Sequence, residues 1–326
     1  MNNTRICVIG AGRWGINHIK TLLKLGVLGG VVDIDIEKIK SIRERYSKVI
    51  FFDNLEDAFK ENFDGFVVAT PPSTHFEITK SVLYKSKPVL VEKPLTLSLK
   101  EGKKIKTICD KLDGTLMVGH LLLFHPAIER MKALIEENII GDIQYIYSNR
   151  INLGTVRKEE SVLWSFAPHD ISLFQYFNDS FPIQVSSDGG AFLQKNIHDT
   201  TITYLKYPNG VHGHIYVSWL HPFKEHRIVI IGSKGSLYFE DFPEQKLLLY
   251  EKKINSKSDK IFLTNKPSKS IEFDQTKPLT NELKYFIDVI KGKQVQKTKI
   301  NEGLDVVKIL ELASDSLENN NATSIL

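Results

Sequence analysis

The sequence predicts an α/β protein of two domains, a doubly wound parallel sheet followed by an α+β domain with a largely antiparallel open sheet. Three observations predict it. The length of 326 residues suits about two domains of ~150 residues. Up to residue 120, short β-branched runs alternate with stretches of helical period, as in successive βαβ units. After Gly119, strand patterns follow one another with only turns between them. We therefore expect domains at 1–120 and 121–326.

The first domain should contain six buried strands and five helices. The apolar runs predict strands at residues 6–9, 30–32, 49–52, 66–69, 89–91 and 116–118. Helical periodicity predicts helices at residues 15–25, 36–46, 55–62, 75–85 and 98–111. The last two helices begin just after proline and Ser/Thr residues, which are helix-start signals.

The second domain should open with one amphipathic helix at residues 126–137 and continue mainly as strands. We expect strands at residues 144–152, 200–207, 211–219, 227–231, 236–240 and 246–250. Gly210 and Gly232 mark two of the turns between neighbouring strands. Further helices are expected at residues 171–177, 281–291 and 302–318, and the lysine-rich stretch 252–269 is interpreted as a solvated hairpin loop.

Composition excludes several classes of function. Lys plus Arg is 43 and Asp plus Glu is 39, so the net charge of +4 predicts no nucleic-acid partner. Two cysteines, Cys7 and Cys109, fit a reducing compartment, and we expect a cytoplasmic protein. No uncharged run approaches the ~18 residues of a membrane span, so no membrane association is expected. His212 and His214 share a strand face but lack a third ligand, so no metal site is expected.

A glycine motif follows the first strand and opens the first helix. Gly10, Gly12 and Gly15 fit GxGxxG: the first permits a tight turn, the second lets the backbone approach a pyrophosphate, and the third allows close helix packing. Arg13 and Trp14 lie within the motif and are counted with the cofactor-binding residues. The alternative is a glycine-rich turn without a ligand.

An acidic residue at the end of the second strand completes the dinucleotide signature. Asp33 lies 33 − 15 = 18 positions after Gly15, close to the ~20 expected for the acid that binds the adenosine ribose. Its carboxylate would repel a 2′-phosphate, which favours NAD over NADP. Asp35 competes for this role, but its position suits the N-cap of the next helix better.

Three further motifs follow the later strands: Ala69-Thr70-Pro71-Pro72-Ser73-Thr74-His75, Glu92-Lys93-Pro94 and Gly119-His120. With the glycine motif, they resemble the glucose-fructose oxidoreductase, inositol dehydrogenase and rhizopine-catabolism (Gfo/Idh/MocA) family of sugar oxidoreductases. The resemblance covers essentially the whole chain, including the pattern that begins Asn281-Glu282-Leu283. It implies a Rossmann domain and NAD as cofactor. The further cofactor-binding residues are then Thr70, Pro71, Pro72, His75, Glu92, Lys93 and His120.

The resemblance also implies two catalytic residues. Lys93 takes the position of the family's lysine beside the nicotinamide, and an ammonium group there can stabilise a developing alkoxide. His169 takes the position of the family's acid-base histidine, whose unperturbed pKa near ~6.5 suits proton transfer at neutral pH. Ser165 stands where the common pattern has aspartate, which counts against a simple polyol dehydrogenase. Asp170 could orient the imidazole or cap the helix that follows.

The stretches 145–157 and 162–170 resemble the subgroup of the family that oxidises C3 of UDP-linked N-acetylated sugars, the UDP-N-acetylglucosamine 3-dehydrogenases. Arg150 and Arg157 offer fork geometry to a diphosphate, and Trp164 offers a flat face to a ring. Asn152 can read hydroxyl or amide groups. Lys93, Ser165, His169 and Asp170 complete the expected substrate-binding set.

The resemblance therefore implies hydride transfer from sugar C3 to NAD, giving a UDP-3-keto sugar. It further implies a pyridoxal-phosphate aminotransferase that consumes this product to make 3-amino sugars for a lipid A or O-antigen glycan. A homodimer or homotetramer is expected, as is usual in the family. Three alternatives remain: an NAD-dependent glycosidase, an inositol-type polyol dehydrogenase, and a non-enzymatic regulator that binds NAD and sugar.

Overall fold

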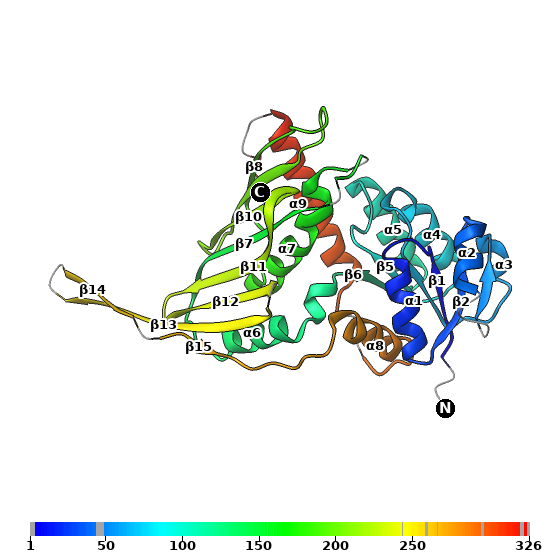
Figure 1. The fold of residues 1–326 in the computed structure, drawn as a ribbon, viewed down its shortest axis with the longest axis horizontal. Helices are drawn as coiled ribbons and strands as arrows, with labels where there is room; N and C mark the ends of the chain where they lie inside the picture. Colours follow the sequence, from blue (N-terminus) through cyan, green and yellow to red (C-terminus); the bar gives the residue numbers. More distant parts are fainter. Residues whose placement is uncertain are drawn as a thin grey trace. The chain divides into compact units, whose positions relative to one another are not determined.

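The computed structural model describes residues 4–43, 49–154, 156–158, 160–242, 244–257, 260–265, 267–294, 297–319 and 323–324. The chain divides into two compact units (Figure 1), Met1–Phe124 with Lys277–Lys308 and His125–Thr276 with Ile309–Leu326. The segment 277–308, which the sequence analysis places in the second domain, thus groups with the first unit. The first boundary falls at Phe124 rather than at residue 120.

A parallel sheet of six strands forms the centre of the first unit. Its order is β3-β2-β1-β4-β5-β6. The strands are β1 (Ile6–Ile9), β2 (Leu28–Val32), β3 (Ile50–Phe52), β4 (Gly65–Val68), β5 (Val89–Glu92) and β6 (Leu116–Gly119). All neighbours pair in parallel, which confirms the doubly wound prediction. The order reverses between β1 and β4, and such a reversal opens a ligand crevice at the carboxyl ends of the strands.

The strands are connected by α1 (Gly15–Lys24), α2 (Ile36–Arg43), α3 (Leu55–Ala58), α4 (His75–Tyr84) and α5 (Leu99–Lys111), with the short 3₁₀ helix η1 (Pro72–Thr74) before α4. The 3₁₀ helix η2 (Leu121–Phe124) follows β6, and α8 (Pro278–Ile290) joins the unit from later in the chain. Asn54 and Ser98 cap α3 and α5 by accepting backbone N–H bonds, which explains where these helices begin. The prediction for α2 extends into residues 44–46, which lie outside the described residues. Helix α8 packs against α1 and η2.

The second unit contains a mixed sheet. In the described part of the chain its order is β14-β13-β12-β11-β7-β10-β9-β8-β16, with β15 paired to β13. The strands are β7 (Ile143–Leu153), β8 (Gln184–Gly190), β9 (Thr200–Lys206), β10 (His212–Ser218), β11 (Leu220–Gly232), β12 (Gly235–Phe242), β13 (Lys246–Lys257), β14 (Lys260–Asn265), β15 (Lys269–Ser270) and β16 (Thr323–Ser324). Only β7 and β10 pair in parallel among these described pairs, so the largely antiparallel prediction is confirmed. The sequence analysis missed β8, β15 and β16, and part of the stretch 252–269 that it interpreted as a loop instead extends β13 and forms β14, which pair antiparallel.

Three helices complete the second unit: α6 (Pro126–Glu136), α7 (Val162–Asn178) and the carboxyl-terminal part of α9 (Ile300–Asn319). Helix α7 packs on β7, β9 and β10. The predicted helix at 171–177 was wrong in its start, because α7 begins at Val162 and continues through Pro168. His169 and Asp170 therefore lie inside a helix and not before one. No helix among the described residues is long and apolar enough to cross a membrane.

Candidate active site

The glycine motif forms the turn between β1 and α1, and its three glycines have different surroundings there. Gly10 has φ of 97°, and a Cβ there would lie 2.7 Å from the carbonyl oxygen of Ala69. A Cβ on Gly15 would collide with the carbonyl group of Gly10. A Cβ on Gly12 would meet nothing within 4 Å. The turn thus needs Gly10 and Gly15 for its own packing, whereas Gly12 leaves open space in front of the helix.

Asp33 follows β2 and joins the glycine turn directly. One carboxylate oxygen accepts the N–H of Ala11 at 2.6 Å and the other accepts the N–H of Asp35 at 2.9 Å. Asp35 itself accepts the N–H groups of Glu37 and Lys38 at the start of α2. Its predicted capping role is confirmed, which leaves Asp33 as the acid at the turn.

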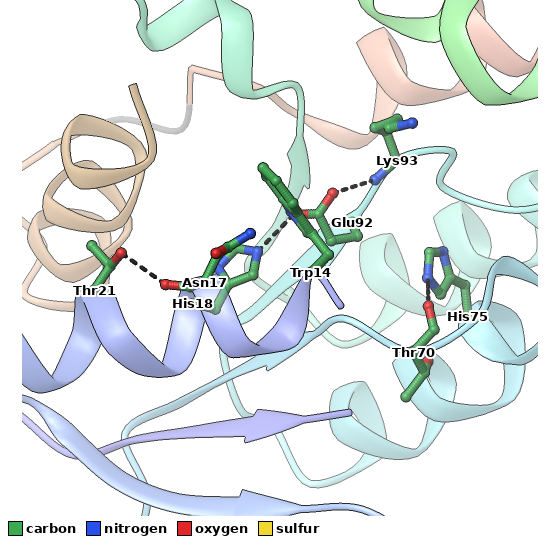
Figure 2. Close-up of polar contacts among 8 residues, drawn as sticks. All are labelled: Trp14, Asn17, His18, Thr21, Thr70, His75, Glu92 and Lys93. Carbon is green, nitrogen blue, oxygen red and sulfur yellow. Dashed lines mark hydrogen bonds and ion pairs between the residues drawn. The ribbon is translucent and has the colours of Figure 1, made fainter. Parts of the chain in front are cut away.

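A buried carboxylate links the glycine-motif helix to the end of β5. Glu92 is 8% exposed. Its Oε1 accepts the indole N–H of Trp14 and lies 2.7 Å from Nε2 of His18 (Figure 2). Its Oε2 accepts the backbone N–H of Lys93 at 3.3 Å. Burial opposes ionisation of Glu92, but the hydrogen bond and charge of His18, with the charge of Lys93, hold its pKa below the ordinary value.

His75 connects the two loops that follow β4 and β5. Its ring nitrogens lie 2.8 Å from the carbonyl oxygen of Pro94 and 3.0 Å from that of Thr70 (Figure 2). Burial lowers the pKa of His75, which favours the neutral ring. Pro71 and Pro72 lie between Thr70 and His75 and start the short helix η1. His75 therefore holds the loop after β4 next to the loop after β5 at the carboxyl edge of the sheet.

Lys93 and His120 follow β5 and β6 at the same edge of the first sheet. Lys93 is half-buried and is joined to Pro94 by a cis peptide bond. His120 is 1% exposed, and neither ring nitrogen has a hydrogen-bond partner among the described residues. Burial, assisted by the charge of Lys93 and opposed by that of Glu92, lowers the pKa of His120 to about 4. A neutral imidazole thus offers one donor and one acceptor beside Lys93.

These residues fit a dinucleotide. The space in front of Gly12 admits a pyrophosphate, and the start of α1 supplies the positive end of a helix dipole. Asp33 can accept from ribose hydroxyls, and the two free nitrogens of His120 can pair with an amide. No group of three or more His, Cys, Asp and Glu residues that could hold a metal ion occurs in the described part of the chain.

In the second unit, α7 carries Trp164, Ser165, His169 and Asp170. Trp164 is half-buried, and its indole N–H donates to Ser314 Oγ of α9 at 2.9 Å. Ser165 is buried, and His169 is half-buried one helical turn later. Because residues four apart share a helix face, Ser165 and His169 lie on the same side of α7.

Asp170 forms a buried ion pair with Arg150 of β7. The guanidinium Nε and one terminal nitrogen donate to the two carboxylate oxygens at 2.7 and 3.1 Å, and the residues are 1% and 9% exposed. The expectation that Asp170 caps a helix was therefore wrong, because Asp170 lies within α7, and its carboxylate binds Arg150. This pairing occupies two donors of the arginine proposed for a diphosphate.

The other two expected substrate residues lie near the end of β7. Arg157 pairs with Glu160 at 2.5 Å, and its side chain is 47% exposed. Asn152 is half-buried, and its Oδ1 is buried without a hydrogen-bond partner in the described residues. Substrate contacts of Arg150, Asn152, Arg157 and Trp164 stay predictions.

The sequence analysis missed His18, which holds Glu92. The available signal was its spacing: His18 lies four residues after Trp14, so both face the same side of α1. It also did not anticipate that Glu282 of α8 would be fully buried in the first unit.

Two family models match the chain. One is described as the oxidoreductase family, NAD-binding Rossmann fold, and matches residues 4–120. The other is the GFO/IDH/MocA C-terminal domain and matches residues 128–238. The first match covers the parallel sheet with its connecting helices, and the second covers β7 to β11 and the start of β12.

Known proteins resemble the chain over most of its length. The scyllo-inositol 2-dehydrogenase (NAD(+)) of Bacillus subtilis is 25% identical over 271 residues, which cover 78% of this chain and 79% of that protein. The structure of UDP-N-acetylglucosamine 3-dehydrogenase GnnA from Acidithiobacillus ferrooxidans has a TM-score of 0.85 at 20% identity, covering 97% of both chains. The WlbA dehydrogenase from Bordetella pertussis, in complex with NADH and UDP-GlcNAcA, has a TM-score of 0.80 at 20% identity and covers 99% of both chains. These two structures share the fold.

Replacing Asp33 should change cofactor preference. We expect Asp33→Ser to weaken NADH binding about tenfold and to reduce the preference over NADPH, since the carboxylate both binds ribose hydroxyls and repels a 2′-phosphate. Fluorescence titration of both cofactors measures this. Asp35→Asn is the matched control and should bind like the parent; equal effects of the two changes would contradict the assignment.

Breaking the Arg150–Asp170 pair should cost stability. Asp170→Ala leaves a buried, unpaired guanidinium and should lower the free energy of unfolding by about 3–5 kcal/mol in urea denaturation. Glu160→Ala, which breaks the more exposed pair with Arg157, should cost at most about 1 kcal/mol. Similar losses for both variants would refute a structural role for the buried pair.

Proposed function

Because this chain belongs to the Gfo/Idh/MocA family of NAD-dependent oxidoreductases, we propose that it oxidises the C3 hydroxyl of a UDP-linked N-acetylated hexosamine, UDP-N-acetylglucosamine, to the 3-keto sugar. The observation that carries the substrate part is the whole-chain similarity to two solved nucleotide-sugar dehydrogenases, GnnA and WlbA. The resemblance of residues 145–157 and 162–170 to the same subgroup supports it independently of the fold.

Lys93 supplies the positive charge for the reaction. It follows β5 at the carboxyl edge of the sheet, and its backbone N–H is held by the Glu92 carboxylate. When bound, NAD provides the acceptor for the hydride that leaves the substrate carbon. Negative charge develops on the C3 oxygen as its proton is removed and disappears as the hydride leaves and the carbonyl forms, and the Lys93 ammonium group stabilises that alkoxide.

His169 acts as the general base. A half-buried imidazole on α7 can take the proton of the C3 hydroxyl at a ring nitrogen. The adjacent carboxylate, Asp170, accepts from Arg150 with both of its oxygens. Ser165, one turn earlier on the same face of α7, is the side chain that replaces the usual aspartate there.

Inositol dehydrogenases are the second candidate, because curated relatives of this chain act on inositols. Ser165 argues against this assignment, since a serine hydroxyl cannot supply the negative charge of the aspartate in the common pattern. Retention of both Lys93 and His169 argues against a regulator without activity.

The proposal also includes partners. A 3-keto nucleotide sugar is a substrate for a pyridoxal-phosphate aminotransferase, and we expect one to consume the product. We further expect a homodimer or homotetramer in the cytoplasm.

The proposal is tested with purified protein, NAD and a panel of UDP-sugars and free polyols. An added aminotransferase with glutamate draws the unfavourable oxidation forward, and mass spectrometry identifies the trapped sugar. We expect NADH formation and a 3-amino product with UDP-N-acetylglucosamine. Turnover of inositol alone would transfer the assignment to the polyol dehydrogenases, and sugar release without NADH would indicate a glycosidase.

Single substitutions test the two catalytic roles. Lys93→Ala and His169→Ala should each lower kcat by about 10²–10⁴-fold, as expected for loss of charge stabilisation or of a general base, while NADH binding stays within about threefold of the parent. Lys100→Ala and His212→Ala remove exposed residues of the same types and should keep parental rates. Parental rates in both Lys93→Ala and His169→Ala would refute the mechanism.

A further inference from the structure

The second unit contains a buried carboxylate, Asp199, that the proposed reaction does not use. Asp199 directly precedes β9 and is 0% exposed. Its Oδ2 accepts the backbone N–H groups of Phe192 and Leu193 at 2.7 and 2.8 Å, whereas its Oδ1 has no hydrogen-bond partner among the described residues. Buried polar groups are normally satisfied, so a half-satisfied carboxylate calls for an explanation. Both side-chain hydrogen bonds go to the 191–198 loop, which joins β8 to β9.

This loop is a small hairpin of its own. Gln194 and Ile197 form an isolated antiparallel bridge, and Asn196 at the turn has φ of 64°, a conformation that asparagine adopts more readily than most residues. At the base of the hairpin, the backbone N–H of Asp199 donates to the carbonyl oxygen of Gly190 at 2.8 Å. Asp199 therefore closes the hairpin with its backbone as well as with its side chain.

The 191–198 loop contacts the segment that leads into α7. Gln194 Nε2 donates to the carbonyl oxygen of Arg157 at 2.8 Å. The carbonyl oxygen of His198 accepts the N–H of Val162 at 3.0 Å; this is the first N–H of α7 and has no acceptor within the helix. The loop therefore holds the backbone at Arg157 and at the start of the helix that carries His169.

Arg157 is the residue of this segment that suits an anionic ligand. Its side chain is 47% exposed, and Glu160 pairs with one terminal nitrogen of the guanidinium. A guanidinium has five N–H donors in a planar fork that fits phosphate groups. A long exposed side chain loses conformational freedom when it binds a ligand, and fixing its backbone beforehand reduces that cost. The hydrogen bond to the Arg157 carbonyl group therefore favours binding of a diphosphate there.

We propose that Asp199 is a positioning residue for the substrate: it holds the 191–198 loop, and the loop holds Arg157 where the diphosphate of a nucleotide sugar binds. This inference rests on the proposed function, because it requires a substrate with a diphosphate. Asp199 takes no part in the transfer of proton or hydride. Its loss should raise KM and leave kcat almost unchanged, because α7, which carries His169, is also packed on β7, β9 and β10.

The first experiment needs no substrate and follows tryptic cleavage of the native protein after Arg157 and Lys195, identified by mass spectrometry. Asp199→Ala removes both side-chain hydrogen bonds to the loop and should speed these cleavages about tenfold, because local opening exposes the backbone to the protease. Asp199→Asn keeps an acceptor oxygen and should stay within about twofold of the parent. Asp188→Ala removes an exposed carboxylate of β8 and is the matched control, with cleavage like the parent. Unchanged cleavage in Asp199→Ala overturns the proposal.

The second experiment measures KM and kcat for UDP-N-acetylglucosamine with NAD. Asp199→Ala should raise KM about tenfold with kcat within about threefold of the parent, and Asp199→Asn should restore KM to within about twofold. Gln194→Ala removes only the contact with the Arg157 carbonyl group and should raise KM about threefold, which keeps the test available if Asp199→Ala does not fold. NADH binding should be parental in all three variants. A fall in kcat with an unchanged KM overturns the proposal.

The third experiment separates positioning of Arg157 from a general effect on the fold. Arg157→Ala alone should raise KM, and adding Asp199→Ala to it should change KM by at most about twofold further, because the loop acts through that arginine. Independent, multiplicative effects of the two changes on KM would overturn the proposal. Failure of the proposed function would instead appear in the parent, as absence of turnover with UDP-N-acetylglucosamine, and the positioning role would fall with it.

Discussion

The buried Glu92 carboxylate is the interaction on which the first unit's site depends. It stands at the end of β5 and takes hydrogen bonds from the glycine-motif helix and from the backbone of Lys93. A buried charge is costly unless it is paired and hydrogen-bonded, so the burial of the Glu92 carboxylate depends on its contacts with His18 and Trp14. The glycine turn, the start of α1 and the lysine loop are thus fixed by a single group, and a dinucleotide approaching that edge meets a preorganised surface.

Most of the first unit could be predicted from the sequence because its signals are local. All six strands of the first sheet and the start of each connecting helix follow from apolar runs, glycines and capping residues within a few positions. The same holds for Gly10, Gly15 and Asp33, whose positions in the turn agree with the motif. Less of the second unit could be predicted from the sequence. Strand β8, for example, has the sequence QVSSDGG, and its one large apolar residue and two glycines give no strand pattern.

The errors in the second unit share one physical origin, namely that tertiary contacts outweighed local signals. Pro168 resembles a helix-start residue, yet α7 passes through it and packs on β7, β9 and β10. Asp170 resembles a cap, but it pairs with Arg150 from a strand 20 positions earlier. No spacing rule within α7 could predict that partner. The burial of His18 and Glu282 likewise depends on two helices that are far apart in the sequence.

The central claim is that a nucleotide sugar presents its C3 hydroxyl to Lys93 and His169 in the presence of NAD. The most direct measurement is an experimental structure of the protein with NADH and UDP-N-acetylglucosamine. The account predicts sugar C3 within about 3–3.5 Å of nicotinamide C4, with Lys93 Nζ and an imidazole nitrogen of His169 both within hydrogen-bond distance of O3. A different sugar carbon facing the nicotinamide, or a sugar bound away from both side chains, would contradict it.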